Sequence, residues 1–444
     1  MKITLIRPNL GATRSSDAME PLCFAILKGL TPPGVEIACY DERIEPVPYD
    51  EPTDLAALTV ETYTARRSYQ IAAEYRRRGV KVVMGGYHPT LLPEEALRFA
   101  DVVVRGDAEG VWRQLVADAE RGRLRRIYDG GFPALAGAPP DRSVFRGKRY
   151  APIALVQWGR GCRYACDFCS IRAFYGSRLR QRPIRDLVDE IERIGRKRVF
   201  FVDDNLFANA RKARELVASL IPLRIRWSCQ ISIDVASDRE LVKLLEKSGC
   251  TTATIGFESL DEGNLRQMKK ASNLKYDDYA TAIRILRDAG MMIYGTFVFG
   301  YDRDTVSSFD VTLEFALRHH FFLANFNPLT PTPGTPLFDR LKREKRLIYD
   351  RWWLDPRYRY GEAIFHPRGM SAEELTRGCY RARSEFNAYR AIYRRLLNPR
   401  AHLRSPHRIG TYLAANLISR REIHAKQGMA LGDPTALDPC EQMP

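Results

Sequence analysis

The stretch IALVQWGRGCRYACDFCSI, residues 153–171, joins an apolar run to a cysteine-rich loop. Its first seven residues are mostly apolar, which is typical of a strand buried in a parallel sheet. Cys162, Cys166 and Cys169 follow directly, at a C-x3-C-x2-C spacing. Ligand sites of parallel α/β folds lie at the carboxyl ends of the strands. The stretch therefore predicts three thiols gathered at the end of a central strand.

The spacing of these thiols favours a metal site over three unrelated core cysteines. A structural zinc ion would need a fourth Cys or His nearby, and the nearest histidines in the sequence are His88 and His319. An iron–sulfur cube takes one thiolate per iron, so three thiolates leave one iron open to an exchangeable ligand. We therefore prefer the iron–sulfur interpretation, with zinc as the alternative.

Further strand-like runs on both sides of the cysteine loop predict two α/β domains. Five runs follow the loop, at 198–204, 225–232, 251–258, 292–300 and 321–328, with helical stretches between them. Six βα repeats in all predict a partial (β/α)6 barrel. Another five runs precede the loop, at 2–8, 35–41, 54–60, 80–86 and 100–106. Because a helical pattern at 68–79 lies among them, they predict a doubly wound, Rossmann-like sheet.

The chain is thus expected to have four segments. A first domain spans 1–130, and a linker rich in Gly and Pro spans 131–150. The barrel spans 151–345, and a mainly helical region spans 346–444. Helices are expected at 371–397 and 405–424, and the last twenty residues are expected to form a frayed tail.

The chain of 444 residues is basic, with a formal net charge of +16. Between Arg377 and Lys426 twelve Arg or Lys residues stand against two acids, Glu385 and Glu422. A solvated basic face is the simplest interpretation, and contact with an anionic membrane surface is left open. Nucleic acid is not expected, because aromatic-interleaved RNA-binding motifs are missing.

The sequence also predicts a cytoplasmic protein. It contains no run of eighteen apolar residues, so we expect no transmembrane helix. The first residues, MKITLIRPNL, lack the features of a signal peptide. Six of the nine cysteines are scattered singly, so no disulfide framework is expected.

The cysteine motif after the first strand of a six-fold βα series resembles that of the radical S-adenosylmethionine (SAM) superfamily. The resemblance implies a [4Fe–4S] cluster held by Cys162, Cys166 and Cys169, with SAM on the open iron. It implies cleavage of SAM to a 5′-deoxyadenosyl radical, with electrons from a donor such as a flavodoxin or ferredoxin. It also implies that Phe168, just before the third cysteine, packs against the adenine.

Three later segments resemble further motifs of this superfamily: FVDDN (201–205), TIGFES (254–259) and GTFVFG (295–300). The resemblance implies SAM contacts by Asp204, Glu258, Gly295 and Gly300. In WSCQISID (227–234), Gln230 and Ser232 are expected to reach either the SAM ribose or the substrate, and Gln230 is the preferred SAM contact. The two glycines would let the adenine approach the backbone closely. The plainer alternatives are that Asp204 caps the next helix and that the glycines mark β-bulges.

A doubly wound domain in front of such a barrel resembles the cobalamin-binding class of radical SAM enzymes, as do the segments 59–72, 85–97 and 103–113. The resemblance implies bound cobalamin. Its lower side would face Glu61, Thr62 and Thr64, and its nucleotide tail would lie along Gly85, Gly86 and His88. The loop 40–47, which in classical cobalamin domains holds the cobalt-ligating His, contains none. We therefore expect no His on cobalt; a domain that binds no corrinoid is the alternative.

The resemblance as a whole implies a cobalamin-dependent radical SAM enzyme. It would methylate an unactivated carbon of a small molecule, such as a natural product or a lipid-like compound. One alternative is a radical cyclase, oxidase or rearrangement enzyme, with or without cobalamin. Another is an RNA-modifying, methylthiotransferase-like enzyme, although its usual RNA-binding terminal domain is missing. Residues 351–370, rich in aromatics and Arg, are expected either to line the substrate pocket or to pack in the core.

Overall fold

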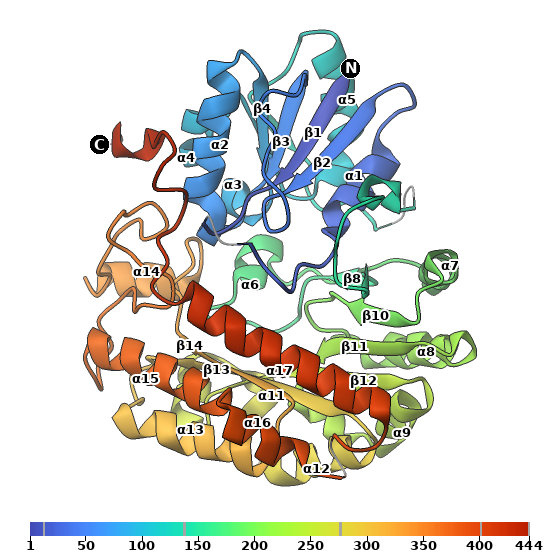
Figure 1. The fold of residues 1–444 in the computed structure, drawn as a ribbon, viewed down its shortest axis with the longest axis vertical. Helices are drawn as coiled ribbons and strands as arrows, with labels where there is room; N and C mark the ends of the chain where they lie inside the picture. Colours follow the sequence, from blue (N-terminus) through green and yellow to red (C-terminus); the bar gives the residue numbers. More distant parts are fainter. Residues whose placement is uncertain (12–13, 136–138, 275–277, 400–401, 443–444) are drawn as a thin grey trace.

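The computed structural model describes residues 1–11, 14–135, 139–274, 278–399 and 402–442. Two six-stranded parallel sheets, one above the other in Figure 1, form the two halves of the molecule. Helices cover both faces of the upper sheet and the outside of the lower one. The predicted α/β class, with a doubly wound sheet before a partial barrel, is confirmed.

The first sheet has the strand order β2-β1-β3-β4-β5-β6. Its strands are β1 (Lys2–Arg7), β2 (Glu36–Asp41), β3 (Leu55–Thr59), β4 (Lys81–Gly85), β5 (Val102–Arg105) and β6 (Ile127–Asp129). The short β6 was not predicted. The order reverses between β1 and β3, and ligands of doubly wound sheets bind beyond the strand ends at such a reversal.

Alternate residues of these strands feed two separate cores, because successive side chains of a strand point to opposite faces. On one face Leu5 and Val83 pack with α1 (Leu22–Leu30) and α5 (Trp112–Glu120). On the other, Leu58 and Met84 pack with α2 (Ala65–Arg77) and α4 (Pro93–Phe99). The helix α3 (Tyr87–Leu91) follows β4 directly.

The second sheet has the order β14-β13-β12-β11-β10-β7, with every neighbouring pair parallel. Its strands are β7 (Ala154–Val156), β10 (Arg198–Phe201), β11 (Arg226–Ile231), β12 (Cys250–Glu258), β13 (Met292–Phe299) and β14 (Leu323–Pro328). Since β7 and β14 are its two edges, the barrel is open on one side. A two-stranded antiparallel ribbon, β8 (Gly159–Arg160) and β9 (Arg180–Gln181), extends from β7 toward the first sheet.

The helices of the barrel follow its strands in turn and bury its outer face, except the first of them, which contacts Tyr87–Leu91 of the first domain. They are α6 (Ser170–Tyr175), α7 (Ile184–Ile194), α8 (Ala210–Leu220), α9 (Arg239–Lys247), α10 (Glu262–Gln267), α11 (Ala271–Leu274), α12 (Tyr279–Asp288) and α13 (Val306–Arg318). Among the described residues, no helix combines the length and the hydropathy that crossing a membrane requires.

The C-terminal region contributes α14 (Pro336–Arg343), α15 (Ala372–Phe386), α16 (Tyr389–Leu396) and α17 (Pro406–Lys426). The single helix expected at 371–397 is thus two helices. Figure 1 shows α17 lying across the strands of the barrel. In the segment 351–370, Trp352 and Trp353 are buried against residues of the first domain, which favours the core-packing alternative for this part.

The expectation of a frayed tail is wrong for the described residues after α17. Asp438 forms an ion pair with Arg66, and Gln70 exchanges hydrogen bonds with Asp433. Both partners lie on α2, so the tail packs against the first domain. The last two residues, like 136–138 in the expected linker, lie outside the described part of the chain.

Candidate functional site

A cavity of about 460 Å³ lies where the carboxyl ends of the first sheet face the barrel. The first sheet contributes residues that directly follow its strands, and the barrel side contributes Gln157, Arg160 and Tyr175. The strand-end residues are Arg7, Thr59, Glu61, Gly85, Gly86, Gly106 and Asp107. We call this cavity the interdomain pocket.

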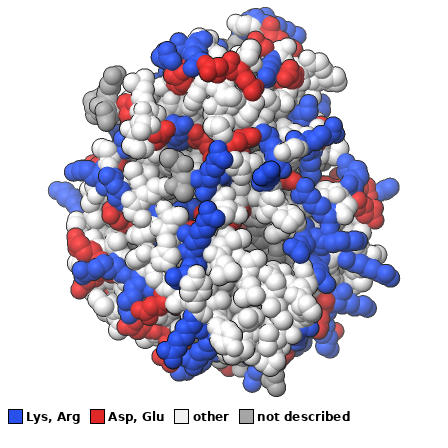
Figure 2. Space-filling view, in the orientation of Figure 1, with Lys and Arg blue, Asp and Glu red and all other residues white. Residues whose placement is uncertain are grey.

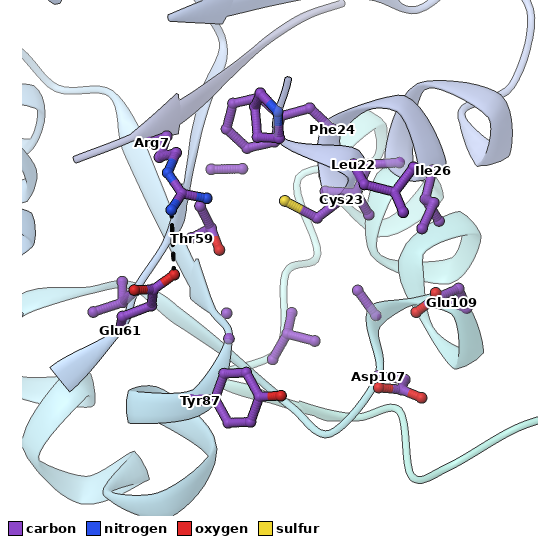
Figure 3. Close-up of a pocket in the computed structure, with 18 of the residues that line it drawn as sticks. Arg7, Leu22, Cys23, Phe24, Ile26, Thr59, Glu61, Tyr87, Asp107 and Glu109 are labelled. Carbon is purple, nitrogen blue, oxygen red and sulfur yellow. Dashed lines mark hydrogen bonds and ion pairs between the residues drawn. The ribbon is translucent and has the colours of Figure 1, made fainter. Parts of the chain in front are cut away.

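The interdomain pocket has an apolar wall and a polar wall, as Figure 3 shows. Leu22, Phe24 and Ile26 enter it from α1. Opposite them, Arg7 and Glu61 reach from the strand ends and form an ion pair of 3.4 Å. A mainly apolar lining with a few polar groups is typical of a small-molecule or cofactor site.

Gly86 shapes the floor of this pocket. It has a φ of +110°, and a Cβ there would lie 2.8 Å from the carbonyl oxygen of Val60. The position therefore needs glycine for both its backbone conformation and its close contact with the loop after β3. Gly85 beside it has room for a Cβ, whose nearest neighbour would be Val104 at 3.6 Å.

Buried ion pairs join the two domains beside the pocket. Arg160 of β8 pairs with Glu109 at 2.6 Å and with Asp107 at 3.1 Å, and Arg180 of β9 pairs with Asp107 at 2.6 Å. Burial alone would raise the pKa of Glu109, but the Arg160 guanidinium holds it below its usual value. Arg160 stands two residues before Cys162, so the cysteine loop is tied to the loop after β5.

The cysteine loop runs between β8 and α6, and two adjacent acids from the end of β10 hold its start. Asp203 accepts hydrogen bonds from the backbone N–H groups of Trp158 and Gly159, at 3.0 and 2.5 Å. Asp204 accepts one from the N–H of Gly161, at 2.7 Å. Burial raises the pKa of Asp203 to about 7 and also raises that of Asp204.

The three thiols of this loop are free. Burial raises the pKa of Cys166 to about 11, with the positive charge of Lys270 acting in the opposite direction. Burial also raises the pKa of Cys169. In the part of the chain that the structure describes, no three His, Cys, Asp or Glu side chains are arranged around a single metal ion. A [4Fe–4S] cube is larger and takes one thiolate per iron, which suits three thiols spread along one loop.

Glu258 lies beside this loop at the end of β12, in a strained conformation. Its φ is +63°, and the pairing of β12 with β13 shifts register at this point. Its carboxylate accepts a hydrogen bond of 2.8 Å from Lys270. Burial acts to lower the pKa of Lys270. The negative charge of the Glu258 carboxylate acts in the opposite direction, and the pKa of Lys270 is raised overall. Strain stored in a non-glycine residue is common at ligand sites.

The sequence predicted SAM as the partner of Glu258, and the contact with Lys270 was not predicted. The two residues are twelve positions apart, and nothing in the local pattern signals their contact. The expected SAM residues Phe168 and Gln230 also lie on this side of the barrel: Phe168 packs at the margin of the barrel core, and the side chain of Gln230 is exposed.

Gly295 and Gly300 differ from the expectation that their missing side chains make room for the adenine. A Cβ on Gly295 would lie 2.4 Å from Phe321, and one on Gly300 would lie 2.7 Å from Phe365. Both neighbours belong to the core outside the barrel. The space beside each glycine is therefore filled by an aromatic ring of the protein.

The six expected cobalamin residues fall into two groups. Glu61, Gly85 and Gly86 line the interdomain pocket. Thr62, Thr64 and His88 do not line it and are buried. The imidazole of His88 is fully buried, 3.0 Å from Glu95 and 3.1 Å from the Tyr69 hydroxyl. The sequence reasoning missed Arg7, Asp107, Glu109 and Arg160.

Two family models match the halves of the molecule that meet at this site. The radical SAM superfamily model matches residues 156–316, and the B12 binding domain model matches residues 32–116. The bacteriochlorophyllide d C-12(1)-methyltransferase of Chlorobaculum tepidum is 31% identical over 390 residues, which are 85% of this chain and 84% of that protein. This chain belongs to the radical SAM superfamily and carries a B12-binding domain. The bacteriochlorophyllide d C-8(2)-methyltransferase of Chlorobaculum tepidum is also 31% identical, over 74% of this chain and 78% of that protein.

Solved structures share the fold over most of the chain. The radical SAM methyltransferase TsrM of Kitasatospora setae, with cobalamin and a [4Fe–4S] cluster bound, has a TM-score of 0.62 at 15% identity, covering 85% of this chain and 81% of that one. The cobalamin-dependent radical SAM enzyme OxsB has a TM-score of 0.66 at 12% identity, covering 95% and 72%. These structures show the shared fold. The two family models and the methyltransferase relatives show that this B12-binding radical SAM protein is an enzyme whose cofactors are a [4Fe–4S] cluster, SAM and cobalamin.

Proposed function

We propose that the enzyme methylates an unactivated carbon of a small-molecule substrate held between the cysteine loop and the interdomain pocket. The observation that carries this proposal is the tie between the two sites. Arg160, two residues before Cys162, forms buried ion pairs with Asp107 and Glu109 of the B12-binding domain. The two similar methyltransferases of Chlorobaculum tepidum support the reaction type.

When bound, the cluster with SAM supplies a radical that removes a hydrogen atom from the substrate, and cobalamin supplies the methyl group. The chain itself places these groups and excludes water. We propose Cys162, Cys166 and Cys169 as the cluster ligands. Asp203 and Asp204 position their loop through backbone N–H groups.

We propose that SAM lies between the cysteine loop and the ends of β11 and β12. Phe168 and Gln230 then contact it directly, and the Glu258–Lys270 pair offers one charge of each sign to its amino and carboxylate groups. Asp204, Gly295 and Gly300 act through the backbone that they hold in place. Cobalamin lies in the interdomain pocket against Glu61, Gly85 and Gly86, with Thr62, Thr64 and His88 supporting the loop after β3.

We further propose that residues 1–130 form the cobalamin-binding domain and 151–345 the barrel, joined by 131–150, with 346–444 covering the barrel's open side. The enzyme works in the cytoplasm, and a flavodoxin or ferredoxin supplies the electron that SAM cleavage consumes.

The test is the mass of the product. The reconstituted enzyme is incubated anaerobically with a reductant, SAM carrying a trideuterated methyl group, and a substrate panel that includes bacteriochlorophyllides. Methylation predicts a product that carries the deuterated methyl group. A product with no added methyl group would instead favour a cyclase or oxidase. A specific relative supports this second candidate: the anaerobic magnesium-protoporphyrin IX monomethyl ester cyclase of Cereibacter sphaeroides is 28% identical over 76% of this chain and 59% of its own length.

A further inference from the structure

A second cavity of about 470 Å³ lies inside the barrel, below the level of the cysteine loop. We call it the lower chamber. Its walls are mainly apolar and come from the first halves of the barrel strands and from α17. The residues that face it from the strands include Phe200, Ser228, Thr252, Thr254, Tyr294 and Leu323.

The lower chamber is in line with the reaction site. Every second residue of a regular strand faces the barrel interior, so Gln230 follows Ser228 on β11. Gln230 is exposed although it points inward, which leaves the interior open at its level. On β12 Gly256 follows Thr254 in the same way, and the register shift before Glu258 ends this alternation.

Four arginines gather at the lower end of this chamber. Arg198 and Arg226 begin β10 and β11 and lie side by side in the sheet. Arg404, just before α17, and Arg408, in its first turn, line the same chamber. Arg198 also lies 3.3 Å from Nδ1 of His407. Figure 2 shows the face that α17 crosses, where Lys and Arg side chains border a broad uncharged area.

Two of these four guanidinium groups are bonded to the backbone: Arg404 and Arg408 donate to the carbonyl oxygens of Asp288 and Gly290. Among the described residues, none of the four forms an ion pair with Asp or Glu, whereas Arg160, Arg180 and many others do. The groups also repel one another: burial, with the charges of Arg404 and Arg226, lowers the pKa of Arg408 to about 10. Like charges collected beside an apolar cavity are favourable when an anion binds there.

We propose that the lower chamber binds the substrate as an amphipathic anion. The apolar body fills the barrel interior, and a carboxylate or phosphate headgroup pairs with Arg198 and Arg226. This inference rests on the proposed function for the use of the ligand: a molecule longer than the chamber extends past Gln230, and its reacting end lies between the cysteine loop and the interdomain pocket. A compact polar substrate would leave both the apolar walls and the arginines unused.

The test measures binding to the full chain without cofactors, so that it is independent of methyl transfer. Three probes of equal chain length are titrated calorimetrically below their aggregation limits: dodecanoate, dodecyl phosphate and dodecan-1-ol. We expect one site per chain and at least tenfold tighter binding of one or both anions than of the alcohol. The tighter of the two anions identifies the headgroup chemistry.

Two variants separate the headgroup from the apolar body. The double variant R198Q/R226Q should weaken anion binding about tenfold and leave dodecan-1-ol unaffected. Its matched control is R121Q/R239Q, which changes two exposed arginines outside the chamber. The variant T254F should fill the chamber and weaken the binding of all three probes.

Equal affinity for anions and alcohol, no binding of any probe, or unchanged anion binding by R198Q/R226Q would overturn the inference. If the enzyme transferred methyl groups but bound no anion, the inference about the chamber would be wrong and the proposed function would stand. Anion binding without methyl transfer to any substrate would support the chamber and count against the function.

Discussion

The carboxylate of Asp204 accepts a hydrogen bond of 2.7 Å from the backbone N–H of Gly161, the residue before Cys162. Its neighbour Asp203 holds the N–H groups of Trp158 and Gly159 in the same way. The end of β10 thus helps to hold the cysteine loop, together with β7 and β8, which precede the loop in the chain. Two strands of the barrel therefore fix where the three thiols lie.

Removing the Asp204 carboxylate should loosen this loop. A hydrogen bond from an amide to a buried carboxylate contributes about 1.5–3 kcal/mol. The variant D204A should therefore bind less iron than the wild type after anaerobic reconstitution and desalting, and D204N, which keeps an acceptor oxygen, should be intermediate. The control is D50A, because Asp50 is exposed in the first domain. Equal iron content in D204A and the wild type would show that the bond does not position the loop.

Arg160 should be needed to hold the two domains together at the pocket. Replacing it with methionine leaves the partly buried Glu109 without this partner and the buried Asp107 with Arg180 alone, which weakens the contact between the domains. We expect R160M to retain less hydroxocobalamin through gel filtration, measured by its absorbance. R105M is the matched control, since Arg105 pairs with Asp129 at the surface. If R160M retained as much hydroxocobalamin as R105M, cobalamin binding would not depend on the contact between Arg160 and the first domain.

The pair Glu258–Lys270 gives a prediction that distinguishes folding from SAM binding. K270M leaves the buried carboxylate unpaired and should lower both the thermal midpoint and the affinity for SAM. The double variant E258Q/K270M removes both charges, so it should recover the midpoint but not the affinity. Equilibrium dialysis with labelled SAM measures the affinity, and K243M serves as a surface control. Recovered SAM binding in the double variant would mean that the pair is only structural.

Cobalamin should bind without an imidazole on cobalt. His88 is the one histidine in residues 1–130, and its ring is buried against Glu95 and Tyr69. Electron paramagnetic resonance of the Co(II) form should therefore show a base-off signal without splitting from an axial nitrogen. Folded H88A protein should give the same spectrum. Axial nitrogen splitting in the wild type would contradict the placement of cobalamin in the interdomain pocket as described.

Sequence patterns predicted the fold because many strands are short runs of mainly apolar residues, such as those that became β3 and β5. They also placed the cysteine loop correctly after the first barrel strand. The short β6 escaped prediction because three residues carry too little pattern. The packing of the tail on α2 escaped because it depends on partners, such as Arg66 and Asp438, more than 370 positions apart.

The site was predicted less completely, for two physical reasons. A motif shows that Gly295 is a glycine but not which face of the strand its missing side chain leaves free, and that space belongs to Phe321. Contacts between domains also leave no local signal. Arg160 and Glu109 are 51 positions apart, and only the assembled fold brings them together.

The central claim is that the thiols of Cys162, Cys166 and Cys169 hold the cluster on which SAM is cleaved. The most direct measurement is the amount of 5′-deoxyadenosine formed from SAM and dithionite by the reconstituted wild type, by the triple alanine variant of these cysteines, and by C379A, which changes a buried cysteine of α15. In the wild type and C379A we expect about four irons per chain and cleavage of SAM. In the triple variant we expect iron content and SAM cleavage at background level. Undiminished 5′-deoxyadenosine formation by the triple variant would contradict the account.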